Sequence, residues 1–312
     1  MKADVAVIVV TWNSRADLER LLPSVHEGAR SASIQLIVVD NASTDGSAAL
    51  VEARYPEARI IRNAHNAGFA AANNQAMLVA DARYVMLLNP DTVVMPGAID
   101  VLVGFLDARE HVWVAGPALL NSDGTEQRSG VRFPAVWNIL VEALFLDRLF
   151  PSTRLFGAHR ELYLDSTRPR PVDYVQGSCM AVRSRAITVT GTLDEGYFMY
   201  FEETDWCRRI KQAGGEVWIC PDARVVHFGG EGPGHYDERR VKYYHAGLLR
   251  YFRKHTNSAT RIALRVVVML RTLLRMAVWA LVLAARPRLR GAALSSLRGY
   301  AALPRMLIRE PL

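Results

Sequence analysis

Carboxylates occur where apolar runs of this sequence give way to polar loops. In LLNPDTVV, residues 87–94, Pro90 ends the run and places Asp91 in the loop that follows. A carboxylate that acts together with diphosphate oxygens and water is the ligand set that Mg²⁺ or Mn²⁺ prefers. Capping of the following turn is the alternative role. The motif therefore predicts a divalent-cation site at Asp91, with a purely local role left open.

A second acidic group precedes a helical segment at 206–213 and comprises Glu202, Glu203 and Asp205. Acidic side chains in a first helical turn complement the helix dipole, which accounts for one or two of them without any chemistry. Three within four positions, after an aromatic and glycine-rich stretch, exceed that need. Because a neighbouring like charge raises the pKa of a carboxylate, the group suits general-base chemistry near neutral pH.

The stretch VVDNASTDGS, residues 38–47, places Asp40 and Asn41 between a predicted strand and a helix start. Backbone N–H groups and a fixed carboxylate at such a position suit the base or ribose of a nucleotide. Neither Gly-Lys-Ser/Thr nor Gly-x-Gly-x-x-Gly follows the first strand, so ATP hydrolysis and NAD binding lose support. A nucleotide site of another type is favoured.

Apolar runs alternate with helical periodicity in the first part of the chain. The pattern predicts strands at 5–10, 34–39, 60–61 and 84–88, with helices after the first three, the first of them capped by Ser14 and Asp17. Such alternation predicts an α/β fold, a mostly parallel sheet with helices on both faces. Ligands of these sheets bind beyond the carboxyl ends of the strands. The polar residues at those ends are Thr11, Asn13, Asp40, Asn41 and Asp91.

Length and composition bound the remaining choices. Half of the 312 residues are hydrophobic, which supports a large core, and the net charge of +7 is concentrated in the tail. From Arg250 onward 13 Lys and Arg residues face one acid, Glu310, so the preceding body is acidic and a nucleic-acid surface is not expected. Three scattered cysteines indicate neither disulfides nor zinc, and the N-terminus lacks a signal-peptide pattern, so we expect a cytoplasmic protein.

The apolar segment 262–285 is interrupted by Arg265, Arg271 and Arg275, and its longest uncharged run, 276–285, is too short to span a membrane. At 100° per residue, Arg261, Arg265, Arg271, Arg275 and Arg286 fall within a sector of about 120°. We expect an interfacial helix with its basic face toward anionic headgroups, while packing on protein or on a second subunit stays open. The predicted domains are residues 1–255, divided into the halves 1–120 and 121–255, and a basic amphipathic tail (256–312).

Seven blocks occur in the order and spacing that is typical of one family. They are VIVVTWN, VVDNASTDGS, RNAHNAGFAAANN, LLNPDTVV, GSCMAVRSRAI, GYFMYFEETDWCRRIKQAGG and VVHFGG. Residues 4–253 therefore resemble the family 2 glycosyltransferases, which have a Rossmann-like GT-A fold. The Asn-Pro-Asp motif resembles that of the bacterial rhamnosyltransferase subgroup and, more distantly, galactofuranosyltransferases.

The resemblance implies a nucleotide-sugar site with a bound Mg²⁺ or Mn²⁺. Asp91 would hold the metal, and Asn89 replaces the first acid of the more usual Asp-x-Asp motif, so the sugar nucleotide is expected to bring the ion. His227 matches a histidine that completes the metal site in some relatives, although a core histidine is the alternative. The implied nucleotide and sugar contacts are Thr11, Asn13, Asp40, Asn41, Asn66, Gly68 and Asn89.

The resemblance also implies an inverting displacement at the anomeric carbon. Glu203, where the family often has Asp, would deprotonate an acceptor hydroxyl beside Glu202, and Asp205 would orient that hydroxyl. Tyr197, Tyr200 and Trp206 would stack on the acceptor sugar, unless they belong to the core.

The implied function is transfer of a sugar, L-rhamnose from dTDP-rhamnose, to a glycan or polyprenyl-linked acceptor in bacterial surface-polysaccharide synthesis. The expected location is the inner face of the plasma membrane, and a homo-oligomer is left open. A galactofuranosyl or other hexosyl transferase is the first alternative. A non-catalytic nucleotide-sugar-binding module at the membrane is an alternative of another class, and a nucleotidyltransferase is disfavoured because no glycine-rich basic loop follows the first strand.

Overall fold

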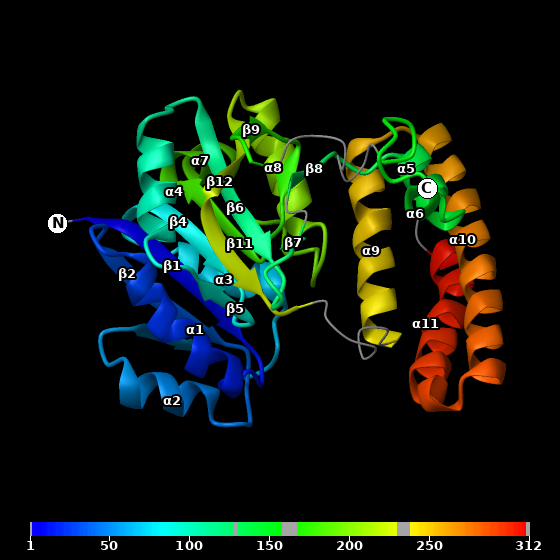
Figure 1. Ribbon diagram of the computed structural model, residues 1–312, viewed down its shortest axis with the longest axis horizontal. Coiled ribbons are helices and arrows are strands. Elements are labelled where there is room, and N and C mark those ends of the chain that lie inside the picture. The colour runs from blue at the N-terminus through cyan, green and yellow to red at the C-terminus, as the bar shows by residue number, and fades with distance from the viewer. Residues whose placement is uncertain (1, 128–129, 158–166, 230–237, 310–312) are drawn as a thin grey trace. The chain divides into compact units, whose positions relative to one another are not determined.

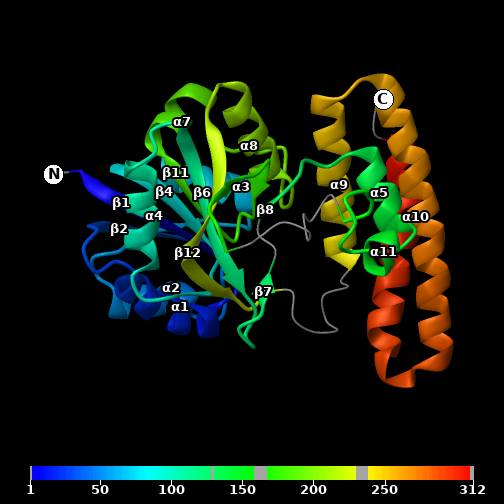
Figure 2. The same ribbon diagram turned by 45° about the horizontal axis from the view of Figure 1, so that its top comes forward.

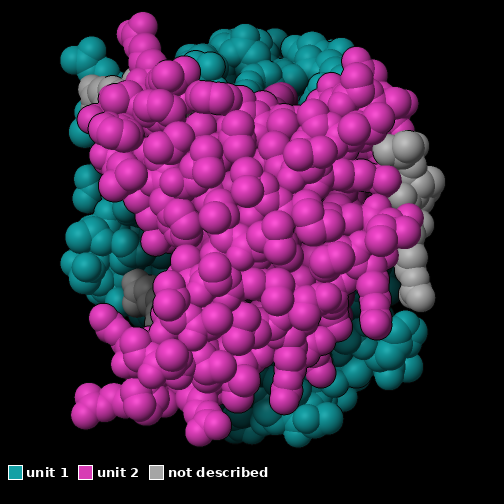
Figure 3. All heavy atoms as spheres, turned by 90° about the vertical axis from the view of Figure 1, so that its right-hand side faces the viewer, with its two compact units in different colours: residues 1–132, 164–198, 202–229 teal, residues 133–163, 199–201, 230–312 magenta. Residues whose placement is uncertain are grey.

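The chain forms two compact units (Figure 3). The computed structural model describes residues 2–127, 130–157, 167–229 and 238–309. Unit 1 contains residues 1–132, 164–198 and 202–229, and unit 2 contains residues 133–163, 199–201 and 230–312. Part of the stretch 121–171, for which the sequence offered no assignment, lies outside the described residues.

Unit 1 is built around one twisted sheet (Figure 1). Its strands are β1 (Ala3–Thr11), β2 (Ile34–Asp40), β3 (Arg59–Arg62), β4 (Ala82–Leu88), β5 (Thr92–Val94), β6 (Val112–Leu120), β7 (Glu126–Gln127), β9 (Arg170–Pro171), β11 (Cys179–Arg183) and β12 (Glu216–His227). The order along the sheet is β3-β2-β1-β4-β11-β6-β12-β5. β3, β2, β1, β4, β6 and β12 run in one direction, while β11 and β5 run against their neighbours. The predicted α/β class and the mostly parallel sheet are confirmed.

Helices cover both faces of the sheet (Figure 1, Figure 2). They are α1 (Arg15–Gly28), α2 (Ser47–Arg54), α3 (Phe69–Met77), α4 (Ala98–Asp107), α7 (Ser184–Thr190) and α8 (Glu202–Gln212). Alternate residues of β1, such as Val7 and Val9, pack with Leu21 of α1 and Leu102 of α4 in one buried cluster. The opposite face receives α3 against β1 and β2, α7 against β4 and β11, and α8 against β12.

One local expectation differs from the structure, and one strand is irregular. Ser14 occupies the N-cap of α1, yet its side chain makes no cap; its hydroxyl donates to the carbonyl of Trp12 (3.2 Å), and Asp17 pairs with Arg20. Strand β12 continues through Pro221 and Asp222, because a register shift against β6 between Cys220 and Arg224 absorbs these turn-like residues.

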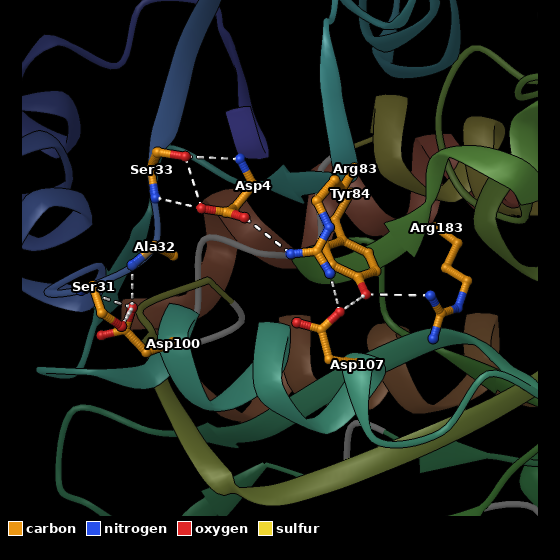
Figure 4. A network of polar contacts seen from close by, with 9 residues as sticks. All are labelled: Asp4, Ser31, Ala32, Ser33, Arg83, Tyr84, Asp100, Asp107 and Arg183. Atoms are coloured by element: carbon orange, nitrogen blue, oxygen red, sulfur yellow. Dashed lines mark hydrogen bonds and ion pairs between the residues drawn. The ribbon is translucent and has the colours of Figure 1, made fainter. Parts of the chain in front are cut away.

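Polar contacts join the amino-terminal ends of the strands (Figure 4). Asp4 accepts hydrogen bonds from Ser33 and pairs with Arg83, and these partners lower its pKa to about 2. Asp107 pairs with Arg83 and accepts from the Tyr84 hydroxyl at 2.6 Å. These two carboxylates accept hydrogen bonds from residues on neighbouring elements and so connect those elements to one another. This edge of the sheet is therefore structural.

The short strand pair β8 (Gly130–Val131) and β10 (Tyr174–Val175) completes unit 1, and the described elements of unit 2 are all helices. Its helices are α5 (Val136–Ala143), α6 (Leu146–Leu149), α9 (Glu238–His255), α10 (Ser258–Ala285), η2 (Pro287–Leu289) and α11 (Arg290–Arg309). Helices α9, α10 and α11 lie side by side in both views (Figure 1, Figure 2). Helix α9 packs on the tail helices and belongs to unit 2 with them, while the predicted division at residue 256 stays a prediction.

The predicted basic face of the tail helix requires a correction. Arg271 is directed toward Glu142 of α5 (3.7 Å) and the ring of Tyr244 of α9, and Arg275 lies over the ring of Phe145 at 4.2 Å. These arginines face the interior of unit 2 because Glu142 of α5 supplies a carboxylate, and Phe145 before α6 and Tyr244 of α9 supply aromatic rings, that accommodate them. They are not available to headgroups.

Candidate active site

Polar residues converge at the carboxyl ends of β1 and β2. Thr11 and Asp40 are paired in register, and the backbone N–H of Asn41 donates to the Thr11 carbonyl at 2.9 Å. Asp40 accepts from the backbone N–H of Ser43 (3.2 Å), while Asn13, with φ of 54°, accepts from that of Thr44 at 2.7 Å. The structure thus brings these predicted residues together. The amide oxygen of Asn13 fastens the loop after β1 to the loop after β2.

The loop before α3 reaches the same edge. Asn66 accepts from the backbone N–H of Gly68 (2.9 Å), and the Asn41 side chain donates to the Gly68 carbonyl (3.3 Å). Gly68 has φ of +86°, and a Cβ there would lie 2.6 Å from the Phe198 carbonyl oxygen. Only glycine suits both this backbone conformation and this close approach. Gly68 therefore shapes the loop whether or not it also contacts a sugar.

Asp91 and His227 face each other because β5 and β12 pair in antiparallel fashion. The register sets His227 opposite Thr92, and Asp91 Oδ1 lies 3.6 Å from His227 Nε2. The Asp91 carbonyl accepts from the backbone N–H of Phe228 at 2.9 Å. At Gly229 a Cβ would lie 2.5 Å from Asp91 Oδ2 and 2.6 Å from His227 Nε2. Glycine at 229 keeps the space beside both side chains open.

Gln127 of β7 orients the imidazole and was missed by sequence reasoning. Its side-chain amide nitrogen donates to the His227 carbonyl (2.7 Å), so its oxygen is the atom 3.0 Å from His227 Nδ1. An amide oxygen only accepts, so Nδ1 carries the proton and Nε2 presents its lone pair toward Asp91. No motif marks Gln127, because only the pairing of β7 with β6 brings it to His227.

The Asp91 and His227 pair fits a divalent cation. Burial raises the pKa of the Asp91 carboxyl, and His227 counteracts this only in part and only when its imidazole is protonated. Carboxylate oxygen and imidazole nitrogen are both acceptors and both metal ligands, so a cation between them satisfies the two together. Among the described residues no cluster of three or more His, Cys, Asp and Glu is placed to hold a metal. A cation here therefore needs further ligands from a diphosphate or water.

The Gly177–Ser178 turn joins the metal loop to the second acidic group. The backbone N–H of Asn89 donates to the Ser178 carbonyl at 2.9 Å. On the other side of the turn, a Cβ at Gly177 would lie 3.6 Å from Glu203 Cβ and 3.5 Å from the ring of Phe69, which follows Gly68. Residues far apart in the sequence are thus neighbours. The Asn89 loop, the Gly68 loop and Glu203 all meet at this turn.

Glu203 has the environment of a general base. Burial raises its pKa to about 6, and burial next to Glu203 also raises the pKa of Glu202. One carboxylate oxygen of Glu202 and one of Glu203 are shielded from solvent and accept no hydrogen bond from the described part of the chain. The hydroxyl oxygens of Thr11 and Ser178 are likewise shielded and have no hydrogen-bond partner there. Buried polar atoms of this kind are rare in folded proteins. Two of them, on Ser178 and Glu203, lie at or next to the Gly177–Ser178 turn and are candidates for contact with a polar ligand.

Three predicted acceptor contacts are not supported. Asp205 is fully buried and pairs with Arg209 at 2.9 Å, which in turn donates to the carbonyls of Thr190 and Thr192. Trp206 is also fully buried, and its indole N–H donates to the Gly191 carbonyl at 2.9 Å. Both side chains point into the core because α8 packs against the loop after α7. Tyr197, exposed by only 2%, is likewise a core residue.

Tyr200 lies in the segment 199–201, which belongs to unit 2, and its predicted acceptor contact stays a prediction. Tyr200 and Phe201 have φ of 71° and 72°, a conformation that large side chains seldom adopt. The ring of Phe201 lies 5.2 Å from that of Tyr244 and 6.0 Å from that of Tyr251. The strained pair directly precedes Glu202 in the chain.

Comparison with known sequences identifies the family. A sequence model described as Glycosyl transferase family 2 matches residues 6–187, more than half of the chain. The chain belongs to this family. The glycosyltransferase is 31% identical, over 71% of its own length and 75% of the relative's, to an N-acetylglucosaminyl-diphospho-decaprenol L-rhamnosyltransferase of Mycobacterium tuberculosis. It is 24% identical, over 64% of its length and 70% of the relative's, to the rhamnosyltransferase WbbL of Escherichia coli.

A solved structure extends the comparison to the fold. The mannosyltransferase PcManGT of Pyrobaculum calidifontis, in complex with GDP-Man and Mn²⁺, aligns with 99% of the glycosyltransferase and 89% of its own chain. The TM-score is 0.57 and the identity is 16%, so this likeness concerns the fold alone. It confirms the predicted GT-A-type architecture.

Proposed function

We propose that this glycosyltransferase moves L-rhamnose from dTDP-rhamnose to a lipid-linked glycan acceptor with inversion at the anomeric carbon. The names of the two relatives support rhamnose, and that of the mycobacterial relative supports an acceptor linked through a diphosphate to a polyprenol. The product would enter a bacterial surface polysaccharide.

In this proposal the nucleotide lies at the carboxyl ends of β1 and β2. Thr11, with its unpartnered hydroxyl, and Asp40 would contact the nucleoside, and the Gly68 loop would face the sugar. Asp91 and His227 would hold Mg²⁺ or Mn²⁺ on the diphosphate, with Asn89 beside them. When bound, the cation would stabilise the negative charge that develops on the leaving diphosphate.

Glu203 would accept the proton of the acceptor hydroxyl as that oxygen attacks the anomeric carbon. A carboxylate with a pKa raised to about 6 is ionised at neutral pH and still basic enough to assist the attack. Burial and the neighbouring Glu203 raise the pKa of Glu202 well above its ordinary value, because two carboxylates in one buried site resist joint ionisation, so Glu203 is the residue expected to ionise.

The observation that carries this proposal is the turn at Gly177–Ser178. It contacts Asn89 of the metal loop on one side and Glu203 on the other. A site that held only a nucleotide would have no use for a buried, unpartnered carboxylate next to the sugar end of the donor. Catalysis is therefore favoured over the non-catalytic binding module.

The test combines a donor panel with three variants. Release of nucleoside diphosphate would be measured for dTDP-rhamnose, UDP-galactofuranose, UDP-glucose and GDP-mannose, with Mn²⁺, with Mg²⁺ and with chelator, with and without a polyprenyl-diphosphate-linked acceptor. Asp91→Asn and Glu203→Gln would be compared with Asp123→Asn, an exposed loop carboxylate that bonds only to its own turn.

We expect metal-dependent turnover of dTDP-rhamnose that both site variants lose and that Asp123→Asn keeps. Turnover of a UDP-sugar instead would make the protein a hexosyl or galactofuranosyl transferase. Binding of a donor without turnover, unchanged in Glu203→Gln even with the acceptor present, would show a binding module.

A further inference from the structure

The solvent-facing side of α10 is apolar along its whole length. From Ile262 to Ala285 every exposed position carries an aliphatic side chain, and Val266, Leu273 and Leu281 are 65%, 59% and 70% exposed. The exposed residues are Ile262, Ala263, Val266, Leu270, Leu273, Ala277, Val278, Ala280, Leu281, Ala284 and Ala285. The best 18-residue window of the helix has a mean hydropathy of 2.0 and is only 17% buried within the molecule. Soluble surfaces rarely leave such a patch uncovered.

The shape of this patch distinguishes between partners. At 3.6 residues per turn the exposed residues span an arc of about 160° and a length of about 36 Å. A coiled-coil seam is narrower, and it carries polar residues at its borders that set the register. The patch has no polar side chain among its exposed positions. A broad, featureless apolar surface fits a fluid hydrocarbon phase better than a second protein helix.

Cations flank both ends of the patch. Arg286, Arg288 and Arg290 are exposed where α10 passes into α11, and Lys254 is exposed before the helix begins. The sequence contains no Asp or Glu from 239 to 309. An apolar face between exposed basic clusters is complementary to lipid acyl chains beneath anionic headgroups.

We propose that α10 docks unit 2 on an anionic lipid bilayer, lying in the plane of the interface with its apolar face among the acyl chains. In this orientation the apolar face of α10 enters the bilayer and the arginine stripe faces away from it, since Arg271 and Arg275 remain paired inside unit 2. The same pairing argues against a membrane-spanning α10. A spanning helix would have to leave α5, α9 and α11, and Arg271 and Arg275 would then lose their partners in unit 2. This inference rests on unit 2 alone and is independent of the donor sugar.

The binding test uses the full chain and vesicles without any substrate. Flotation with phosphatidylcholine vesicles containing about a third of phosphatidylglycerol would be compared with flotation with pure phosphatidylcholine. Leu273→Asp combined with Leu281→Asp is the test variant, and Leu78→Asp combined with Val189→Asp is the control, as those two side chains in unit 1 are 81% and 53% exposed. We expect the test variant to lose more than tenfold in affinity and the control to match the wild type.

The charged ends are tested separately. Replacement of Arg286, Arg288 and Arg290 by Gln should weaken binding to anionic vesicles by about a hundredfold at low salt, since each cation near the surface contributes about 1 kcal/mol. The effect should shrink in high salt and be small for neutral vesicles.

A depth measurement keeps the proposal testable even if the aspartate variants unfold. The native cysteines are buried, so Leu273→Cys can be labelled selectively with an environment-sensitive dye, with Val189→Cys as the matched control. We expect a blue shift and quenching by acyl-chain spin labels at residue 273 only.

Three results would overturn the proposal. The first is that the wild type does not float with anionic vesicles. The second is that the wild type binds them and the test variant binds equally well. The third is that alkaline carbonate does not release the bound protein, which indicates a spanning helix. A lipid-free dimer that Leu273→Asp dissociates, together with absent vesicle binding, would assign the patch to a second copy of the chain.

Discussion

Asp91 Oδ1 and His227 Nε2 lie 3.6 Å apart with Gly229 leaving the space beside them open, and Gln127 holds the imidazole so that its lone pair faces the carboxylate. Two acceptors at this distance attract each other only through a proton or a cation. The relationship depends on three strands, because β5 carries the residue after Asp91, β12 ends at His227 and β7 contributes Gln127. It leads to the first prediction.

Gln127→Leu should weaken the binding of Mn²⁺ with nucleoside diphosphate by about 10- to 100-fold, because the imidazole loses the acceptor that fixes its tautomer. Gln127→Glu should restore only part of the affinity, since a carboxylate accepts the same Nδ1 proton but cannot donate to the His227 carbonyl. Titration calorimetry and the electron paramagnetic resonance of Mn²⁺ measure this directly. Equal affinity in Gln127→Leu and the wild type would show that His227 does not hold the ion.

The pH dependence of transfer should report Glu203. Its carboxyl has a pKa raised to about 6 and must be ionised to act as base. At saturating metal, kcat/KM should level off above pH 6 and fall about tenfold per pH unit below it. A profile that stays flat to pH 5 would exclude Glu203 as the base.

Glu203→Gln should lower kcat by about 10²- to 10⁴-fold while making the protein more stable at pH 7. The folded-state pKa lies above the unfolded value of 4.5, so folding favours the protonated form and stability falls as pH rises from 4.5 to 6. Above pH 6 that penalty is complete, on the order of 1–2 kcal/mol, and the amide removes it. Chemical denaturation should show that the substitution raises the free energy of unfolding more at pH 7.5 than at pH 5. An increase that does not depend on pH would contradict the assignment.

Asp205→Asn should have the opposite effect on stability. The carboxylate is fully buried against Arg209, and removal of one partner of a buried pair typically costs about 3–5 kcal/mol. Any protein that remains folded should keep the wild-type pH profile, because Asp205 takes no part in proton transfer. Loss of transfer with unchanged denaturation would return Asp205 to the acceptor site.

Gly247→Ala should destabilise unit 2 by about 1–3 kcal/mol, since a Cβ there lies 2.6 Å from the Tyr200 carbonyl oxygen. The displaced residues are the strained pair that precedes Glu202, so kcat should fall as well. Gly104→Ala is the control, because a Cβ in that helix meets nothing within 4 Å and should stabilise slightly. Hydrogen exchange in α9 measures the loss of stability, and the transfer rate measures the fall in kcat. Wild-type exchange and wild-type rates in Gly247→Ala would contradict the prediction.

The sequence by itself determined the alternating half of unit 1. Buried strands are recognisable in one dimension because both of their faces are apolar, as in β1, β2 and β4, and polar residues at their carboxyl ends share one edge whenever the strands are parallel. Thr11, Asp40 and Asp91 were placed correctly on this basis. The cysteines, expected to be buried thiols, are buried.

Only the tertiary structure decided which polar groups are already satisfied. Asp205 and Glu203 are two positions apart and indistinguishable by sequence, yet Arg209 occupies one while the other faces the Gly177 turn. The arginines of α10 form one stripe by periodicity, and the position of Glu142 in a distant segment turned that stripe inward. Periodicity specifies a face but not its partner, because partners are set by long-range packing that no local pattern records.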